Sequence, residues 1–529
     1  MVAGSLGASM DFLLRWSKRI ALVVCVLVVL SILSTWAFGR FAATRQGPPS
    51  STIPAVAGMG EGTTTLDRMV NPLTDRHPGE SGLKLIASNV DAFASRAMGA
   101  EVAERSLDLM YYIWDGDMTG RMLMATVLDA AERGVRVRIL LDDVGFAGDD
   151  DALKALDSHP NIEVRIFNPT RARGNGLQRG IEMALRIFSV TRRMHNKAWI
   201  IDGQVAIIGG RNIGDIYFDA ARDANYRDLD LLAVGPVVAE TSAMFDAYWN
   251  NPVSLTVQDP ATAVDTAALA ALENSAGQAA NMRDAAPYAA FVRDNTSLAQ
   301  MSEMDLHWDE GARLVADPPE KALAEEGDNW LMREVAGLFA QAETSIEIAS
   351  PYFVPGVIGT ELLTGYAAEG VSVTVLTNSL AATDVAAVHG GYAPYRLPLL
   401  QGRVNLFELR PTASPDSLSF RGSNGASLHT KAFTVDDDLG FVGSLNFDPR
   451  STSLNTEMGI IFENPDLVAE IRAVFAEEIS PALSYRVVLR DGALAWEDHD
   501  LIHTRDPKAS LWRRAFAWVV GILPLESQL

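Results

Sequence analysis

The sequence predicts an α/β protein with two repeated domains, and three observations support this fold class. At 529 residues the chain is too long for one ordinary hydrophobic core. Segments rich in β-branched residues alternate with amphipathic helical stretches, an order typical of α/β layers around a buried sheet. The same succession occurs twice, with Gly134 and Gly370 at equivalent turns 236 residues apart.

An uncharged, apolar run covers residues 20–38 near the N-terminus. Its length matches the roughly 20 residues that cross a bilayer as a helix, and it exceeds the roughly 7–15 apolar residues of a cleaved signal peptide, which is the alternative. Trp16 and Trp36 lie near its two ends, where indole rings favour the membrane interface. We therefore expect a single-pass transmembrane helix as an anchor over residues 1–40. Basic residues are more frequent before the run than after it, which predicts a cytoplasmic N-terminus and an external protein body: Arg15, Lys18, Arg19, Arg40 and Arg45.

The rest of the chain divides into five parts. Residues 41–75 begin with a Gly-, Pro- and Ser-containing stretch and predict a flexible tether. The first α/β domain is expected over residues 76–255 and the second over residues 326–495. A variable, partly helical connecting segment covers residues 256–325 between them. The tail over residues 496–529 contains the apolar stretch 511–523, which predicts either an interfacial helix or a helix docked on the core.

Composition excludes several function classes. The formal net charge is −23, so the protein is a poor non-specific binder of nucleic acid, and no nucleic-acid partner is expected. Cys25 is the only cysteine, which excludes an intrachain disulfide and a cysteine-based metal site. The remaining histidines outside the motifs described next have no metal-ligand spacing: His77, His159, His307, His499 and His503.

A His-x-Lys-x4-Asp motif occurs twice, 234 residues apart. In a strand, His and Lys at positions i and i+2 point to the same face, so that an imidazole and an ammonium group converge on one phosphate. The Asp at the end of the strand can orient an imidazole or pair with a charge. A following Gly-x-x-Asn supplies a tight turn and an amide donor. The first motif contains His195, Lys197, Asp202, Gly209 and Asn212, and the second contains His429, Lys431, Asp436, Gly443, Ser444 and Asn446.

Either motif alone carries little weight, because short motifs often match by chance and an isolated histidine is more often structural. Two copies with the same spacing inside a whole-domain repeat predict a functional site. We interpret the copies as two halves of one site. They differ at one position, where the first copy has Gly210 and the second has Ser444.

These motifs resemble the HKD motifs of the phospholipase D superfamily, and most closely those of bacterial cardiolipin synthases of the C-type branch. The resemblance covers roughly residue 80 to the C-terminus. Stretches outside the motif cores support it: 111–114, 192–197, 209–215, 377–382, 425–429 and 446–452. The resemblance implies two phospholipase D-like α/β domains with mixed sheets, related by a pseudo-twofold axis, with the active site at their seam.

The resemblance also implies a two-step phosphatidyl transfer that needs no metal and no cofactor. One histidine forms a phosphohistidine while the other acts as acid and then base. We favour His195 as the nucleophile on family analogy. The charge on the phosphoryl oxygens would be stabilised by Lys197, Lys431, Asn212 and Asn446. We also expect Ser444, Gly209 and Gly443 to contribute to phosphate binding. Asp228 and Glu457 are expected to hold the motif histidines, with surface carboxylates as the alternative.

The implied activity is cardiolipin synthesis at a bacterial inner membrane. Phosphatidylglycerol is the acceptor, and the donor is phosphatidylglycerol or phosphatidylethanolamine. A phospholipase D that uses water as the acceptor is the main alternative. A phosphodiesterase or nuclease of the same fold, and a membrane scaffold with a decayed site, are less favoured. The sequence predicts no oligomeric state.

Two further groups are weaker candidates for anion binding. His389, Tyr392 and Arg396 share one helical face, for which a solvated surface is the stronger interpretation. Arg171, Arg173 and Arg179 lie in a Gly-containing loop and are candidates for a headgroup contact.

Overall fold

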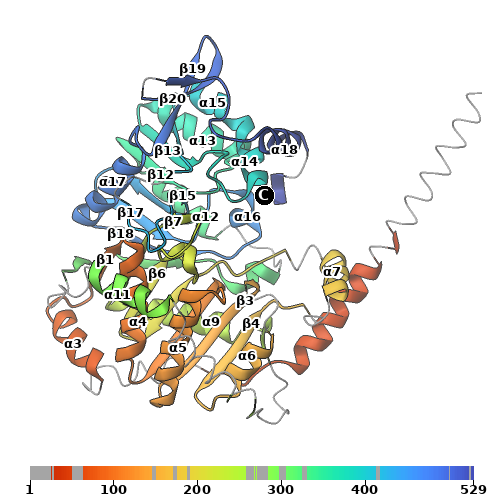
Figure 1. Cartoon of the computed structure of the whole chain (residues 1–529), viewed down its shortest axis with the longest axis vertical. Helices are drawn as coiled ribbons and strands as arrows, with labels where there is room; N and C mark the ends of the chain where they lie inside the picture. Colours follow the sequence, from red (N-terminus) through yellow and green to blue (C-terminus); the bar gives the residue numbers. More distant parts are fainter. Residues whose placement is uncertain are drawn as a thin grey trace, which may run out of the picture.

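The computed structural model describes most of the chain as two α/β domains stacked along the long axis of the molecule (Figure 1). It describes residues 25–26, 29–50, 64–145, 150–170, 176–186, 191–257, 267, 270, 284–296, 305–323, 330–412, 417–499, 501–523 and 526–528. The first part of the predicted anchor therefore lies outside the described residues, whereas residues 29–44 are helical. The described part of the chain contains no helix with the length and hydrophobicity needed to cross a membrane.

The first domain is built on a mixed nine-stranded sheet in the order β10-β1-β8-β6-β5-β2-β3-β4-β9. Its strands are β1 (Ser81–Ile86), β2 (Ser106–Ile113), β3 (Arg136–Gly145), β4 (Ile162–Phe167), β5 (Ala198–Ile201), β6 (Val205–Gly209), β8 (Asp230–Val234), β9 (Ser254–Thr256) and β10 (His307–Asp309). Its helices are α3 (Thr65–Thr74), α4 (Asn89–Val102), α5 (Met118–Glu132), α6 (Asp150–Asp157), α7 (Gly176–Leu185), η1 (Asp215–Tyr217), α9 (Pro236–Trp249) and α11 (Ala285–Asn295).

The second domain is built on a mixed ten-stranded sheet in the order β11-β18-β17-β16-β12-β13-β14-β19-β20-β21. Its strands are β11 (Arg313–Ala316), β12 (Ser345–Ala349), β13 (Ser372–Asn378), β14 (Asn405–Leu409), β16 (Ala432–Val435), β17 (Leu439–Gly443), β18 (Met458–Glu463), β19 (Ser484–Arg490), β20 (Ala493–Asp498) and β21 (Leu501–His503). Its helices are η3 (Pro319–Leu323), α12 (Trp330–Phe339), α13 (Gly356–Glu369), α14 (Ala386–Tyr392), η4 (Ala393–Tyr395), α15 (Arg396–Gln401), α16 (Pro449–Ser453), α17 (Pro465–Glu478), α18 (Leu511–Ile522) and η5 (Glu526–Gln528).

The predicted repeat is confirmed by the strand order. Eight successive strands occupy equivalent places in the two sheets, from β1 and β11 at one end of the series to β9 and β19 at the other. The parallel neighbours β2, β3 and β4 correspond to β12, β13 and β14, and the remaining core pairs are antiparallel in both domains. Parallel neighbours need a crossover connection, and α5 and α13 supply equivalent ones.

The two domains share a hydrophobic core. Helices α9 and α17 follow equivalent strands, and their apolar faces are buried in one cluster with inner-face residues of both sheets. In this cluster Phe245 and Trp249 of α9 lie with Ile208 of the first sheet, and Val468 of α17 lies with Ile460 of the second. Burying apolar surface between the sheets stabilises their relative position. The seam that carries the site is thus part of the folded core.

Three predicted segments contain more structure than expected. Residues 65–74 of the predicted tether form α3, because Thr64 and Asp67 complete a capping box at its N-terminus. The connecting segment contributes β10 to the first sheet and β11 to the second, where each pairs antiparallel with a strand of the repeat. The C-terminal tail extends the second sheet with β21. These strands are short, so they have no recognisable pattern in the sequence, and they form because a neighbouring strand of the sheet pairs with them.

Candidate active site

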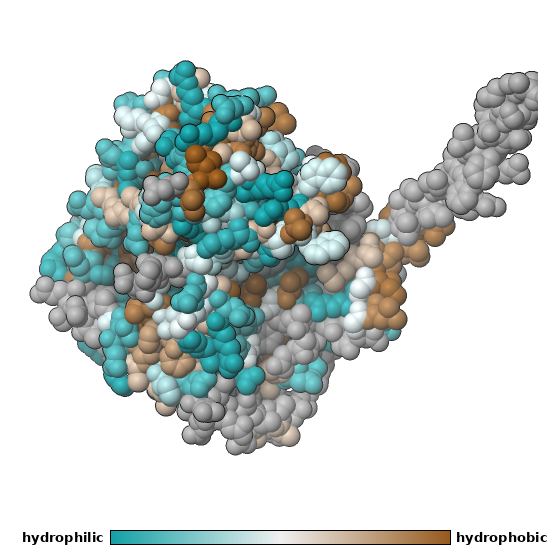
Figure 2. Space-filling model, turned by 45° about the horizontal axis from the view of Figure 1, so that its top comes forward, coloured by the Kyte–Doolittle hydropathy of each residue, from teal (hydrophilic) through white to brown (hydrophobic). Residues whose placement is uncertain are grey.

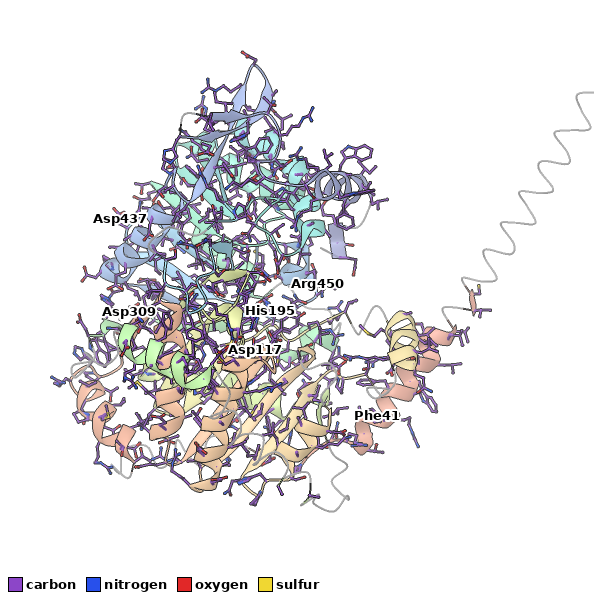
Figure 3. All side chains as sticks on the ribbon, viewed as in Figure 1. Phe41, Asp117, His195, Asp309, Asp437 and Arg450 are labelled. Atoms are coloured by element: carbon purple, nitrogen blue, oxygen red, sulfur yellow. The ribbon has the colours of Figure 1, made fainter. Side chains whose placement is uncertain are left out.

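The two histidine motifs meet at the seam between the domains, where Figure 3 places His195. His195 and Lys197 directly precede β5, and His429 and Lys431 directly precede β16. All four side chains are buried. The motif residues therefore lie at the entry of the predicted strands and not within them. Because the histidines and lysines precede the strands, their side chains are not part of the sheet faces and can meet at the seam.

Each histidine is held by a carboxylate of the other domain. The Nδ1 atom of His195 lies 2.8 Å from Oε2 of Glu457, and the Nδ1 atom of His429 lies 2.5 Å from Oδ2 of Asp228. Both acids are fully buried, which excludes the surface-carboxylate alternative. At His195 the carboxylate on Nδ1 favours the tautomer that carries its proton there and leaves Nε2 as the reactive nitrogen.

Backbone pairing across the seam sets the register of these pairs. The strand β7 (Ala224–Arg227) precedes Asp228 and pairs in parallel with β15 (Gly425–Leu428), which precedes His429. On the other side, Met194 forms a parallel bridge with Thr456, so that the residues before His195 and Glu457 lie side by side. The N–H of His195 donates to the Thr456 carbonyl at 2.9 Å, and the N–H of His429 donates to the Arg227 carbonyl at 2.7 Å.

The one difference between the motif copies follows from the two acids. Ser444 Oγ donates to Oε2 of Glu457 at 2.6 Å, and the Ser444 carbonyl oxygen lies 3.1 Å from Nδ1 of His195. Ser444 was expected to bind phosphate, but here it fixes the glutamate. At Gly210 an added Cβ would lie 2.2 Å from Oδ1 of Asp228, so the shorter acid occupies the space that a serine would need.

The motif lysines lie beside the histidines in a desolvated site. Lys197 Nζ donates to the His195 carbonyl at 2.5 Å, and Lys431 Nζ lies 3.0 Å from Nδ1 of His429. Burial lowers the pKa of Lys197 to about 7, despite the opposing charge of Glu457. Burial also lowers the pKa of Lys431. An anionic phosphate between these two groups would favour their charged forms.

Burial keeps both imidazoles neutral at physiological pH. It lowers the pKa of His195 to about 4, although Glu457 opposes the shift. Burial, followed by the charge of Lys431, lowers the pKa of His429 well below its usual value. Burial alone would raise the pKa of Glu457, but His195 and Lys197 outweigh it and the net shift is downward. A neutral imidazole is the form that attacks phosphorus.

Aromatic rings pack against both imidazoles. Tyr112 meets the His195 ring edge-on at a centroid distance of 5.0 Å, and Tyr226 stacks on the His429 ring at 4.7 Å. The hydroxyl of Tyr226 donates to Oδ2 of Asp384 at 3.0 Å, and the hydroxyl of Tyr352 donates to the same oxygen at 2.8 Å. Asp384 belongs to no repeated motif, so no sequence pattern pointed to it.

The motif aspartates lie away from the histidines, contrary to the expected role. Asp202 and Asp436 follow the far ends of β5 and β16, in left-handed turn conformations with φ of 52° and 53°. Asp202 accepts hydrogen bonds from the N–H groups of Glu104, Arg105 and Ser106. Asp436 accepts the equivalent three from residues 343–345. A strand of four residues spans roughly 13 Å, which places these carboxylates out of reach of the imidazoles. We interpret both as structural.

The motif glycines allow two strands to approach closely. A Cβ at Gly209 would lie 2.5 Å from the Leu229 carbonyl oxygen, and one at Gly443 would lie 2.2 Å from the Met458 carbonyl oxygen. Leu229 and Met458 directly follow the two acids, Asp228 and Glu457. The absence of side chains at these glycines therefore brings the acids towards the seam.

The motif asparagines stay candidates for phosphate contacts. Asn212 Nδ2 donates one hydrogen to the Tyr217 hydroxyl at 2.9 Å, which leaves its second hydrogen for a ligand. Asn446 is buried, and its Oδ1 has no hydrogen-bond partner within the described residues. A phosphoryl oxygen accepts hydrogen bonds, so the group of Asn446 that would bind it is the Nδ2 donor and not this oxygen.

The two weaker candidate groups are largely structural. Arg396 donates to Glu408 and Asp506 at 2.8 Å and lies against His389. Asp506 is half-buried, and the other three residues are buried. The helical face is therefore neither solvated nor open to an anion. The guanidinium group also fills the space between His389, Glu408 and Asp506, whose ligand atoms lie close enough together for a metal.

In the arginine-containing loop, Arg179 pairs with Asp143 at 3.1 Å. Arg171 and Arg173 lie outside the described residues.

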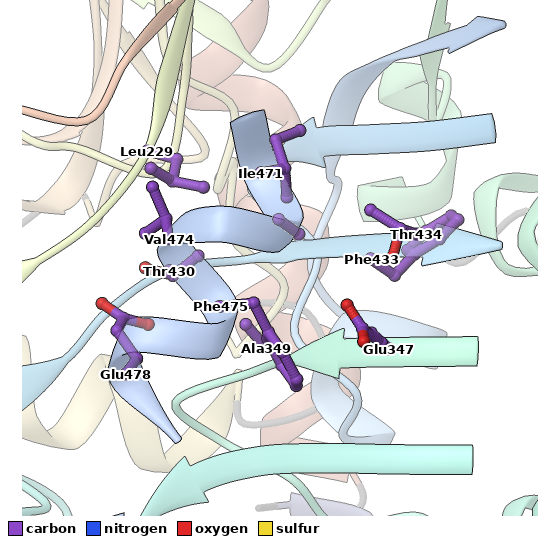
Figure 4. A pocket seen from close by; sticks show the side chains of 11 residues that line it. Leu229, Glu347, Ala349, Thr430, Phe433, Thr434, Ile471, Val474, Phe475 and Glu478 are labelled. Carbon is purple, nitrogen blue, oxygen red and sulfur yellow. The ribbon is translucent and has the colours of Figure 1, made fainter. Parts of the chain in front are cut away.

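A small cavity lies behind the second motif, between β16 and α17 (Figure 4). Its volume is about 10 Å³, which is room for a single water at most. Thr430 and Leu229 line it next to the catalytic region. This cavity is a packing space and is too small for a substrate.

Comparisons with known proteins cover almost the whole chain. Residues 100–249 and 335–479 match the family model described as cardiolipin synthase, PLD-like domain. Cardiolipin synthase C of Escherichia coli (strain K12) is 40% identical over 474 residues, which cover 86% of this chain and 98% of that protein. A cardiolipin synthase of Staphylococcus aureus (strain Mu50) is 22% identical, over 76% of this chain and 68% of its own.

Among solved structures, the phosphatidylserine synthase of Haemophilus influenzae Rd KW20 has the same fold. It superimposes with a TM-score of 0.50 over 78% of this chain and 91% of its own, at 14% identity. At this identity the likeness concerns the fold alone.

Replacing Asp202 by alanine is expected to lower the free energy of unfolding by about 2–4 kcal/mol, because three backbone N–H groups lose a buried acceptor. Urea unfolding followed by circular dichroism measures the loss. The matched control is Asp437→Ala, an exposed aspartate on the outer surface in Figure 3, with an expected change within about 0.5 kcal/mol. A stable Asp202→Ala protein would contradict the structural role.

Proposed function

Because the chain belongs to the cardiolipin synthase family of phospholipase D-like phosphatidyltransferases, we propose that it makes cardiolipin by transferring a phosphatidyl group to phosphatidylglycerol. The observation that carries the proposal is the pair of buried imidazoles at one seam. Each is held through Nδ1 by a carboxylate of the other domain. The two remaining Nε2 atoms serve one phosphodiester from opposite sides.

In the first step the Nε2 atom of one histidine attacks the phosphorus of the donor lipid. The bond between phosphorus and the headgroup oxygen breaks, and this oxygen takes a proton from Nε2–H of the other histidine. Lys197 and Lys431 stabilise the charge on the non-bridging oxygens, together with the amide groups of Asn212 and Asn446. The products are a phosphatidyl-histidine and the free headgroup alcohol.

In the second step a terminal hydroxyl of phosphatidylglycerol attacks the phosphatidyl-histidine. Its proton goes to Nε2 of the second histidine, and the phosphorus–nitrogen bond breaks. The first histidine is restored and cardiolipin leaves. Water in place of phosphatidylglycerol would give phosphatidic acid, which is the alternative activity.

We assign the nucleophile to His195. Its Nδ1 atom has two acceptors, Glu457 Oε2 and the Ser444 carbonyl oxygen, which favours a protonated Nδ1 and a free lone pair on Nε2. At His429 the ammonium group of Lys431 lies 3.0 Å from Nδ1 and competes with Asp228 for this atom. That contact favours a tautomer that carries the proton on Nε2, as the acid of the first step requires.

For the donor we favour phosphatidylethanolamine. Asp384 presents a carboxylate held by two tyrosine hydroxyls, and one of these tyrosines stacks on His429. The Asp384 side chain is exposed, so it is accessible to a headgroup leaving past His429. A carboxylate beside aromatic rings suits an ammonium group better than the uncharged glycerol of phosphatidylglycerol.

We also propose that residues 1–40 anchor the protein in the bacterial inner membrane with the catalytic domains outside, on the strength of the apolar run over residues 20–38 and its flanking charges. Residues 76–255 and 326–495 are the proposed bounds of the two catalytic domains.

The purified full-length protein in vesicles of phosphatidylethanolamine and phosphatidylglycerol is expected to form cardiolipin. His195→Ala and His429→Ala should each lower the rate by at least about 1,000-fold, because neither half of the site acts alone. Mass spectrometry of the lipids measures the products, and Asp437→Ala is the control. Phosphatidic acid without cardiolipin would contradict the proposal and assign a hydrolase.

The same preparation tests the nucleophile. With a donor labelled in its phosphate, alkaline quenching should trap label on His195, and the His195→Ala protein should carry none. Label on His429 in the wild-type protein would reverse the assignment.

The rate is expected to depend on pH through Lys197. In kcat/KM the activity should fall as pH rises through about 7, because the free enzyme loses the ammonium charge at the pKa of Lys197. In kcat this fall should move to higher pH, since the bound phosphate anion favours the charged lysine. Initial rates between about pH 5 and pH 9 measure both profiles. A kcat/KM that stays flat up to about pH 9 would contradict this role.

Replacing Asp384 by asparagine keeps the shape and removes the charge. We expect kcat/KM with a phosphatidylethanolamine donor to fall about tenfold or more, and that with a phosphatidylglycerol donor to change less, because only the first headgroup carries an ammonium group. Rates with each donor and a common labelled acceptor measure the ratio. Equal losses with both donors would show that Asp384 acts by positioning Tyr226.

A further inference from the structure

Helix α18 has its amphipathic pattern turned outwards. The side chains that face solvent are apolar, and two of them are tryptophans. Trp512 is 85% exposed and Trp518 is 67% exposed. With 100° between successive residues, the exposed apolar side chains fall on one continuous face of the helix: Leu511, Trp512, Phe516, Trp518, Val519 and Ile522. A helix that only covers the core of a soluble domain places such residues inwards.

The opposite face of α18 is firmly docked. Ala517 and Val520 are buried, and the helix meets α14 where a Cβ at Gly390 would lie 2.6 Å from the Ala517 carbonyl oxygen. Arg513 also points inwards, where its Nε donates to the Leu380 carbonyl at 3.0 Å and its Nη2 donates to the Thr383 carbonyl. The exposed face is therefore presented by a fixed helix. The sequence left two alternatives for this helix, docking on the core or lying at a membrane interface. In the structure one face of α18 docks on the domain, and the opposite face has no partner within the described residues.

The docked face connects α18 to the active site. Arg513 holds the loop between β13 and α14 at Leu380 and Thr383, and the residue after Thr383 is Asp384. Asp384 bonds to Tyr226, whose ring stacks on His429. The apolar helix thus lies at the edge of the region that receives the donor headgroup.

Other apolar surface lies along the same side of the molecule. Figure 1 shows α18, α7 and the helical residues 29–44 projecting from this side, and Figure 2 shows hydrophobic side chains on the N-terminal helix there. Near the C-terminal turn η5, an apolar cavity of about 720 Å³ opens between α12 and α13. Val357 and Ile358 at its rim are exposed, and Phe447 and Asp448 in its wall follow Asn446 of the second motif.

We propose that the outward face of α18 lies in the headgroup region of a phospholipid bilayer and holds the mouth of the active site at the lipid surface. This inference rests on the proposed function only for its lipid substrate. A bilayer fits better than a protein partner, because tryptophan and aliphatic side chains on one fixed helix face are typical of interfacial helices, and because the site draws its substrates from the membrane. With a net charge of −23 on the protein, apolar burial must drive the contact, so salt should affect it little.

The depth of α18 in a bilayer tests this directly. In a full-length Cys25→Ser background, Phe516→Cys carries a nitroxide label, and Asp437→Cys carries the same label as the control on the outer surface. In vesicles of phosphatidylethanolamine and phosphatidylglycerol, label 516 should be shielded from a water-soluble relaxation agent and accessible to oxygen, and label 437 should remain in water. Equal aqueous exposure of the two labels would overturn the proposal. Shielding that appears without vesicles and rises with protein concentration would also overturn it, and would assign the face to a second copy of the chain.

A functional arm separates this inference from the proposed activity. The triple variant Trp512→Ser, Phe516→Ser, Trp518→Ser should raise the KM for vesicular lipid about tenfold or more, and should turn over a dispersed short-chain phospholipid like the wild type. The matched control is Leu501→Ser with Ile502→Ser, which removes exposed apolar area on β21 at a different place. An unchanged KM on vesicles would overturn the docking role. If the wild-type protein turned over neither the vesicular lipid nor the dispersed short-chain phospholipid, this result would instead contradict the proposed function.

Discussion

The reciprocal contact between histidines and carboxylates across the domain seam is the constraint on which the rest of the structure depends. Glu457 of the second domain holds His195, and Asp228 of the first holds His429. Neither domain contains a complete half-site, so the two sheets must be fixed against each other. The shared core around α9 and α17 and the parallel pair β7–β15 meet this requirement. The repeat in the fold thus exists to build one site.

Burial gives the site its chemistry. Two imidazoles, two ammonium groups and two carboxylates share a desolvated space. For the histidines, the loss of hydration outweighs the attraction of the nearby carboxylates, so the pKa values of both imidazoles are lowered. A phosphodiester anion supplies the missing negative charge when it binds. The charged groups of such a site are already oriented for the substrate, and no water shell has to be reorganised when the substrate reacts. Its lipid substrates reach it from a membrane, which gives the unpartnered face of α18 a physical reason.

Sequence reasoning failed where a residue type has several uses. Asp202 and Asp436 repeat with the motif, yet they bind backbone N–H groups at the far strand ends. Ser444 does not repeat, since the first copy has Gly210 at this position, and its hydroxyl fixes Glu457. His389 and Arg396 have helical spacing, but they are buried against Glu408 and Asp506, which lie 19 and 117 residues after His389 in the chain. Spacing reveals that positions act together and does not reveal what each side chain contacts.

The sequence by itself determined the two-domain α/β fold, the family and the residues at the centre of the site, because a repeated motif with constant spacing can be recognised in the linear sequence. The tertiary structure alone decided which acid serves which histidine. Asp228 follows His195 by 33 residues, and Glu457 follows His429 by 28, so proximity in the chain favours pairing within each domain. The contacts are instead exchanged, because β7 pairs with β15, which precedes His429, and Thr456 forms a bridge with Met194, which precedes His195. Pairing between distant segments depends on how the sheets pack, and no local pattern encodes it.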